Sequence, residues 1–529
     1  MRARVAAAKP PAVPAPTQRL ASARPPQPSG ADAAGVYGRP RETVERAFGQ
    51  KLRRLLRREN RSILLARAFP RRSDWIVLAA VAVVVIAGIV LRAHVIGTND
   101  RVSTDEGGYV YNADRILTDG PIATFKWAPG TSLMFAAAAV LRGYTSIALV
   151  THSHGVAQYA QLLVEIVTLV LVAVLAWILA GPWASLLAVV LIATYDPLID
   201  VTRTYLSEPL GGLAFVAMVA AVCWARKRDL YWLAIAGVVA GCAGLVREDY
   251  AIAVAVIVVG LFVNGLRERR WRAALVRALV YGASALAVVT PYVIYASERE
   301  GAFTPIVSAG PHAFFLGTYL PGGGNQFIDV AVTAKQVCTY FNHLHPSAQL
   351  RAELSISAPY NWCHSPAGDP QGLFAMIQSQ HPGESTNGAA ETAAFHNLDK
   401  YMLGQPLKFL HMLWNKAWNM WSNPWSGGNS VGGGGLAHTT SLLQHQIYSL
   451  IAWIGLVAGL IVLRRRWAFV VPVLGLLACA VLNTFFAITP RDNVRFMPFV
   501  FLFGAVGLVA AASRLVALVH ARAARAAVA

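Results

Sequence analysis

Long apolar runs dominate the pattern of hydrophobic and polar positions from residue 75 onward. Ten of them approach the roughly 20 residues that a helix needs to cross a bilayer core. They lie at about 75–95, 156–180, 183–199, 205–224, 231–247, 249–265, 273–296, 447–463, 467–488 and 496–518. The pattern predicts an all-α polytopic membrane protein with about ten transmembrane helices.

An eleventh apolar stretch, Leu133–Val140, lies between the first two runs. It is too short to span a bilayer and ends at Arg142-Gly143, so it predicts a helix that lies on or dips into the membrane surface. Residues 96–155 are therefore expected to form an outer loop with two surface helices. Counting this stretch as a span would place the later basic clusters on the opposite side of the membrane.

Composition agrees with the hydrophobic pattern: 56% of the 529 residues are hydrophobic and 14% are charged. The net charge of +19 resembles that of a nucleic-acid-binding protein until it is located. Residues 1–72 hold 17 Lys or Arg against 4 Asp or Glu, so most of the excess precedes the first span. A basic segment beside a span is normally retained in the cytoplasm, where it meets anionic lipid. The charge therefore predicts topology, and we expect no nucleic-acid partner.

Three later basic clusters fix the orientation of the predicted spans. Arg226–Arg228, Arg267–Arg272 and Arg464–Arg466 share the side of the N-terminus if there are ten spans. We therefore expect a multi-pass membrane protein with both termini in the cytoplasm, and the high Arg-to-Lys ratio and Ala content indicate a bacterial inner membrane. The expected organisation is a disordered Pro/Ala/Arg-rich tail (1–40), a basic amphipathic interfacial helix (41–72), a transmembrane catalytic core (73–296), a long outer loop (297–446), and C-terminal transmembrane helices with a cytoplasmic tail (447–529).

The long outer loop contains two cysteines and several aromatic residues. Cys338 and Cys363 are the only cysteines in it, and in an oxidising compartment we expect them to form a disulfide. A helix would carry Trp414, Trp418, Trp421 and Trp425 on one face, which suits the lipid headgroup region. Core packing is the alternative for these tryptophans. The spacing of the loop histidines fits no familiar zinc site, although a divalent metal stays open as a cofactor.

Charged residues from separate turns converge on the predicted outer face. Asp105 and Glu106 follow the first span, and Glu208 stands near the start of the fourth. Ionised side chains near a membrane are costly unless they face water or a partner, so they favour a functional interpretation. The alternative for the Asp105-Glu106 pair is a solvated loop with a helix cap.

Several motifs, taken together and in order, resemble those of the GT-C glycosyltransferases that use polyprenyl-phosphate-linked sugars. The resemblance is to the branch of the protein O-mannosyltransferases and the lipid A aminoarabinose transferase, and it covers roughly residues 75–510. The motifs are Asp105-Glu106, Lys126 with Ala128–Leu133, Leu206–Pro209, Ala236–Asp249 and Thr290–Ser308. Two departures are visible. Trp127 and Ala128 separate Lys126 from a single proline, and the arginine turn continues to Glu248-Asp249.

The resemblance implies direct, inverting transfer of a sugar from a polyprenyl-phosphate carrier to a hydroxyl on a glycan, lipid or protein. The departing phosphate needs cations, and of four outer candidates, Arg491 among them, we select Lys126, Arg247 and Arg495. The attacking hydroxyl must lose a proton, for which Asp105 is the expected general base, especially if burial raises its pKa. Glu106 is expected to shape the environment of Asp105 or to bind the acceptor, and Glu208 is the third acidic candidate.

Two other functions are compatible with part of the pattern. A secondary transporter or lipid flippase would place charges near the middle of its spans, whereas here they lie at span ends on one side. An O-antigen ligase or polymerase would share the large outer loop and outer arginines but would not need an Asp-Glu pair after the first span. The sequence therefore favours a membrane glycosyltransferase.

Overall fold

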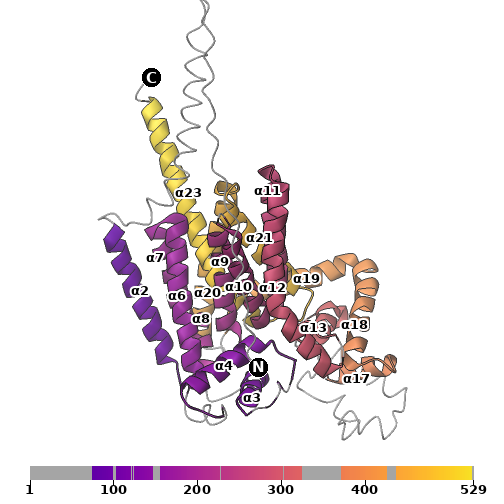
Figure 1. Cartoon of the computed structure of the whole chain (residues 1–529). Coiled ribbons are helices and arrows are strands. Elements are labelled where there is room, and N and C mark those ends of the chain that lie inside the picture. Colours follow the sequence, from indigo (N-terminus) through magenta and orange to yellow (C-terminus); the bar gives the residue numbers. More distant parts are fainter. Residues whose placement is uncertain are drawn as a thin grey trace, which may run out of the picture. The chain divides into compact units, whose positions relative to one another are not determined.

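The computed structural model is built from helices (Figure 1). It describes residues 74–98, 103–146 apart from 119, 121 and 123, 155–301 apart from 227, 303–324, 371–425 and 436–526. Within these residues every regular element is helical, which confirms the predicted all-α fold class. The N-terminal tail and interfacial helix, Cys338 and Cys363 lie outside the described residues.

Each of the ten predicted spans corresponds to a helix. Within the described residues, seven helices are long and apolar enough to cross a membrane, which confirms a polytopic membrane protein. They are α2 (Asp74–His94), α6 (Val156–Ala180), α9 (Glu208–Ala225), α11 (Tyr250–Arg267), α12 (Trp271–Glu300), α20 (Leu436–Val462) and α23 (Met497–Ala526).

The other three predicted spans are shorter or broken. Helix α7 (Pro182–Thr194) continues into α8 (Asp196–Asp200) and η1 (Val201–Arg203) after a bend of 62°, and this pair counts as an eighth span if it is taken as one. Helices α10 (Leu230–Val246) and α21 (Trp467–Asn483) have 17 residues each. At 1.5 Å per residue they are about 25 Å long, which is less than the roughly 30 Å hydrocarbon core. Among the described residues, seven helices, or eight with the bent pair, are thus long enough to span, fewer than the ten predicted.

The spans pack as a bundle in which the backbones of α20 and α23 approach each other closely. Gly455 on α20 lies against Gly504 and Gly507 on α23, and a Cβ at Gly507 would collide with the Gly455 carbonyl oxygen. Small residues allow the two backbones to approach closely, a common device where helices associate in membranes. The main hydrophobic core runs through this contact and includes Tyr195, Phe215 and Phe499.

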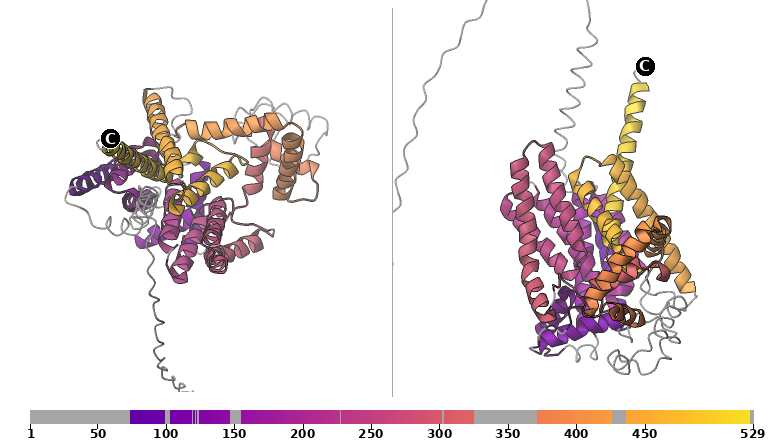
Figure 2. Two further views of the ribbon diagram at one scale, coloured as in Figure 1. Left: turned by 90° about the horizontal axis from the view of Figure 1, so that it is seen from above. Right: turned by 90° about the vertical axis from the view of Figure 1, so that its right-hand side faces the viewer.

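The helices of the two predicted outer loops lie at one end of the bundle and beside it, as Figure 1 and the right-hand view of Figure 2 both show. From the first loop come α3 (Thr104–Leu117) and α4 (Pro129–Leu141). From the long loop come α13 (Gly310–Thr318), η2 (Leu320–Gly322), α17 (Gln371–Gln380), α18 (Thr386–Asn397), η3 (Leu398–Leu403) and α19 (Pro406–Ser422). Part of the long loop thus has its own small core, formed by side chains such as Phe315, Leu373 and Ala390.

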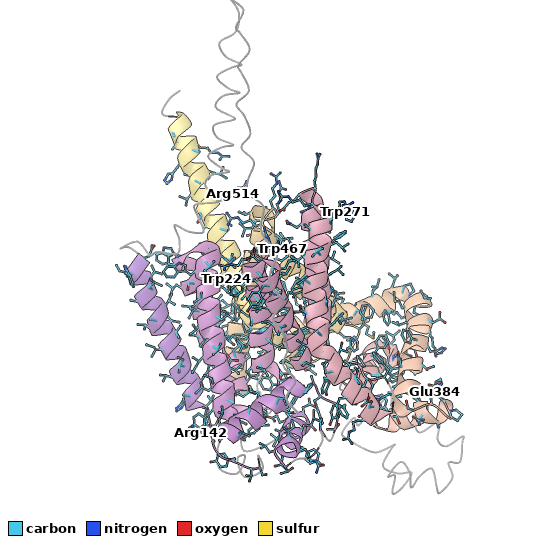
Figure 3. The ribbon with its side chains drawn as sticks, in the orientation of Figure 1. Arg142, Trp224, Trp271, Glu384, Trp467 and Arg514 are labelled. Carbon is cyan, nitrogen blue, oxygen red and sulfur yellow. The ribbon has the colours of Figure 1, made fainter. Side chains whose placement is uncertain are left out.

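Basic clusters lie toward the opposite end. Figure 3 shows Trp224, Trp271 and Trp467, each next to one of the three clusters in sequence, far from Arg142 and Glu384. This separation places the predicted inner clusters and the predicted outer loops at different ends of the bundle.

The prediction that one helix face carries four tryptophans is wrong. Trp414 and Trp418 are exposed on α19, whereas Trp421 and Trp425 are partly buried against the main core. The helix ends at Ser422, so Trp425 does not continue its periodicity.

Candidate active site

The N-terminus of α3 gives the two neighbouring carboxylates different surroundings. Ser103 caps the helix: its Oγ accepts from the Glu106 N–H, and its own N–H donates to Glu106 Oε2 at 2.7 Å. Glu106 Oε1 accepts from the Tyr205 N–H at 2.9 Å. Glu106 therefore satisfies the helix end and ties α3 to the segment before α9. The helix cap that was the alternative interpretation is present, with Ser103 exposed and the Glu106 side chain buried.

Asp105 lies beside this cap and faces a different partner. Its Oδ2 lies 2.7 Å from Arg491 Nη2, and its Oδ1 accepts from Trp127 Nε1 at 3.3 Å. Arg491 Nε lies 3.0 Å from Oε1 of Glu208, whose side chain is 1% exposed. Arg491, from the short helix α22 (Arg491–Val494) before the last span, therefore joins two carboxylates that are about 100 residues apart in the sequence.

The charge of Arg491 controls the protonation of Asp105. Burial by itself would raise the pKa of Asp105, but the Arg491 guanidinium, its hydrogen bond and that of Trp127 outweigh burial and hold the pKa below its usual value. Conversely, the charges of Glu208 and Asp105 outweigh burial and raise the pKa of Arg491. Asp105 is therefore ionised at neutral pH, and the raised pKa that would have favoured it further as a general base is not present because of this ion pair.

A second charge cluster lies on the same segment. Arg495 contacts Asp249 at 2.7 Å and Asp492 at 3.4 Å, while Arg247 lies 3.7 Å from Asp249 and 3.5 Å from Asp492. Asn483 adds a hydrogen bond of 3.0 Å from its Nδ2 to Asp249 Oδ2. The two arginines and two aspartates thus form a ring of four ion pairs.

Ser207 connects the two clusters. Its Oγ accepts hydrogen bonds of 3.1 Å from Arg247 Nη1 and from the Tyr109 hydroxyl of α3. Burial raises the pKa of Tyr109 to about 12, so this hydroxyl keeps its proton and remains a donor. Because Ser207 immediately precedes Glu208, these bonds fix the start of α9 against α3.

Lys126 lies at the exposed side of the site. Its Nζ lies 5.1 Å from the ring centroid of Trp127, the residue that donates to Asp105. The Lys126 charge also contributes to the lowered pKa of Asp105. The intervening tryptophan, which departs from the family pattern, thus lies between the lysine and the carboxylate.

Glu208 keeps hydrogen-bonding capacity in spite of its burial. Arg491 approaches its Oε1, but neither carboxylate oxygen has a well-aligned hydrogen bond among the described residues. A buried acceptor without a hydrogen bond is costly, so such oxygens are frequently met by a ligand or water. In the same described part of the chain, no group of three or more His, Cys, Asp or Glu is arranged to hold a metal ion.

The structure therefore brings most of the predicted site residues together and adds others. Asp105, Glu106, Glu208, Arg247 and Arg495 lie in one connected network, with Lys126 at its side. The sequence-based selection missed Arg491, Asp249, Asp492 and Tyr109. The turn 490–495 showed alternating charge, but nothing in the sequence indicated which of its two arginines would contact Asp105.

No protein-family model and no curated protein matches the chain. Among solved structures the chain is similar to the oligosaccharyltransferase AglB of Archaeoglobus fulgidus in complex with an inhibitory peptide and a dolichol-phosphate. The TM-score is 0.45 and the sequence identity 11%, and the match covers 83% of this chain and 50% of that chain. The apo form of the Archaeoglobus enzyme gives a TM-score of 0.46 and 14% identity over 85% and 52%.

A third similar structure is ArnT of Cupriavidus metallidurans bound to undecaprenyl phosphate, with a TM-score of 0.36 and 15% identity over 83% of this chain and 78% of that chain. The chain spans about half the length of the archaeal enzymes it matches.

Proposed function

We propose that this protein is an integral membrane glycosyltransferase that moves a sugar from a polyprenyl-phosphate carrier to a hydroxyl acceptor on the outer face of the membrane. One observation carries the proposal. Asp105 is ionised, 24% exposed and held by Arg491 next to the buried Glu208, at the end of the bundle where the outer loops gather. A fixed carboxylate at a membrane surface is the group that a hydroxyl acceptor requires.

The reaction needs a proton acceptor and a stabilised leaving group. As the acceptor oxygen attacks the anomeric carbon, its proton passes to the Asp105 carboxylate, a new C–O bond forms, and the bond to phosphate breaks with its electron pair on the phosphate. A single displacement of this kind inverts the anomeric centre. The Oε2 of Glu208, a buried acceptor without a hydrogen bond, is the second group able to receive a hydrogen bond from the acceptor.

The leaving phosphate adds negative charge to a site whose three paired arginines already face four carboxylates. Arg247, Arg491 and Arg495 are paired with carboxylates. Lys126 is exposed and stands beside Trp127, so its ammonium is the cation available at the side of the site to meet the phosphate. Arg247 and Arg495 hold the ring of ion pairs with Asp249 and Asp492.

One ion pair is buried within the spans, where the transporter alternative would place charged residues. Arg92 of α2 lies 3.3 Å from Glu165 of α6, and both side chains are buried within the bundle. Arg92 also donates to the carbonyls of Ile192 and Ala193, the last turn of the broken helix α7. A guanidinium on the free carbonyls of a helix end is a structural cap, so this pair explains how the break at Tyr195 is stabilised.

The decisive experiment is a transfer assay with purified protein in liposomes. Radiolabelled polyprenyl-phosphate mannose, arabinose and glucose are offered with native membrane extract as acceptor, and label is followed into lipid, protein and glycan fractions. We expect one donor to be used by the wild type and not by Asp105→Asn. Glu300→Gln, which removes an exposed carboxylate at the end of α12, is the matched control and should transfer normally. Transfer that requires a pyrophosphate-linked donor would instead support the ligase alternative.

A further inference from the structure

Helix α19 has three rows of side chains with different surroundings. One row is buried against the protein and consists of Phe409, Met412, Lys416 and Met420. Two rows are exposed: an apolar one of Leu407, Leu410, Trp414 and Trp418, and a polar one of Lys408, His411, Asn415 and Asn419. Each row repeats every three or four residues, so each occupies one side of the helix.

The apolar row is a continuous exposed surface. Leu407 is 81% exposed, Leu410 60%, Trp414 65% and Trp418 63%. The indoles of Trp414 and Trp418 are stacked, with ring centroids 6.4 Å apart, so they form one flat apolar surface. A contiguous row of four large apolar side chains marks an interaction surface rather than chance exposure.

The sorting of the two exposed rows identifies the kind of partner. A helix surrounded by water has no reason to separate leucine and tryptophan from lysine, histidine and asparagine. A helix in the hydrocarbon core would not tolerate the polar row. Separation onto adjacent sides fits a helix in the plane of the membrane interface, where tryptophan is enriched and a polar flank meets headgroups and water.

The buried row fixes α19 to the bundle at a defined position. Lys416 Nζ donates to three carbonyl oxygens, those of Gly317, Thr484 and Phe486, at 2.8, 2.6 and 2.9 Å. The Asn493 side chain of α22 donates to the carbonyls of Met420 and Asn423 at the other end of the helix. The helix is therefore held at its middle and at its C-terminal end, and its exposed rows have a fixed direction.

We propose that α19 is a membrane-interface helix, with Leu407, Leu410, Trp414 and Trp418 inserted into the lipid of the leaflet nearest the candidate active site. Its axis runs across the direction of the spans in Figure 1 and in the left-hand view of Figure 2. The partner is the bilayer, and the proposal does not depend on the sugar-transfer reaction.

The test compares two positions on this one helix. In a variant whose native cysteines are replaced by serine or alanine, Leu410→Cys and Asn415→Cys are spin-labelled separately and reconstituted in phosphatidylcholine–phosphatidylglycerol nanodiscs. Power saturation with oxygen and with a water-soluble nickel chelate reports the depth of each label. We expect the label at 410 to be more accessible to oxygen than to nickel, and the label at 415 to show the reverse.

Other outcomes overturn the proposal. A label at 410 that is more accessible to nickel would place the row in water, and a label shielded from both reagents would mean that a second copy or another protein segment covers it. A second measurement needs no cysteine replacement. Brominated lipid should quench less of the tryptophan emission in Trp414→Phe/Trp418→Phe than in the wild type, and an unchanged quenched fraction would contradict lipid contact at these residues.

Discussion

Asp105 and Glu106 are neighbours in the sequence, yet the helix that begins at Ser103 separates their tasks. Glu106 occupies the third helical position, from which its side chain reaches back to the cap. Asp105, one position earlier, points to Arg491 instead. The functional interpretation of the pair therefore applies to Asp105, and Glu106 serves mainly to place α3.

Asp105→Asn keeps the shape of the side chain but removes proton acceptance. General-base catalysis contributes about 10²- to 10⁴-fold, so we expect transfer to fall by at least about 100-fold while carrier-lipid binding stays near that of the wild type. Glu106→Gln should lower the transfer rate by a smaller factor. Initial rates with saturating donor measure both. A well-inserted Asp105→Asn protein with half the wild-type rate would remove Asp105 from the mechanism and leave Glu208 as the next candidate.

The pKa of Asp105 predicts the pH dependence of its ion pair. Because the folded-state pKa lies below the usual value of about 3.9, the pair stabilises the fold above about pH 4, and this contribution is lost as the pH falls through the lowered pKa. The thermal unfolding temperatures of the wild type and of Asp105→Asn should therefore converge in acid and diverge toward neutrality.

The lowered pKa of Asp105 also predicts the pH dependence of the reaction. Because Asp105 stays ionised in mild acid, kcat/KM should show no acidic limb near pH 6 from this residue. A limb there that disappears in Asp105→Asn would contradict the lowered pKa.

Arg491→Gln should destabilise the protein as well as inactivate it. Breaking a buried ion pair by removing one partner costs about 3–5 kcal/mol, and the lower value applies here because 24% of the Arg491 side chain is exposed. The control is Arg142→Gln, an exposed arginine at the same end of the bundle (Figure 3). Adding Glu208→Gln to Arg491→Gln should restore part of the lost stability, since the unpaired buried charge is then removed. No recovery would mean that the pair contributes little.

At the scale of elements, the segment between α21 and α23 depends on α19. Lys416 binds the carbonyls of Thr484 and Phe486 a few residues before Arg491, and Asn493 binds the end of α19. The long outer loop thus contributes no charged group to the described ion-pair network but holds the segment that does. The sequence gives no sign of this contact, because Lys416 and Phe486 are 70 residues apart.

Lys416→Met should therefore weaken the site from a distance. It leaves three carbonyls without their donor, and buried acceptors of this kind cost about 1–3 kcal/mol. Lys408→Met on the same helix removes an exposed lysine and should change stability by less than about 0.5 kcal/mol. Unfolding in detergent and transfer rate are measured for both variants. Equal behaviour of the two would show that the buried bonds of Lys416 do not position the segment.

At the scale of the whole molecule, the arrangement of charge defines two ends. If the end with α3 and α17 faces outward, a cysteine at Ser385 should react with an impermeant maleimide in whole cells, and cysteines at Arg228, Arg269 and Arg466 should react only after the cells are opened. The positive clusters remain inside because moving them across the membrane is unfavourable. Labelling at position 269 from outside would reverse the orientation and place the candidate active site in the cytoplasm.

The sequence by itself determined the fold class, the positions of all ten apolar helices and the convergence of acidic and basic turns, because bilayer thickness imposes long apolar runs and charge bias orients them. Only the tertiary structure decided which charges pair. Arg491 rather than Arg495 contacts Asp105, the pKa of Asp105 falls instead of rising, and the tryptophans of α19 divide between exposed and buried surroundings. Hydrophobic runs are read from neighbouring residues, whereas ion pairs join residues up to 386 positions apart, and the geometry of packed helix ends selects among them.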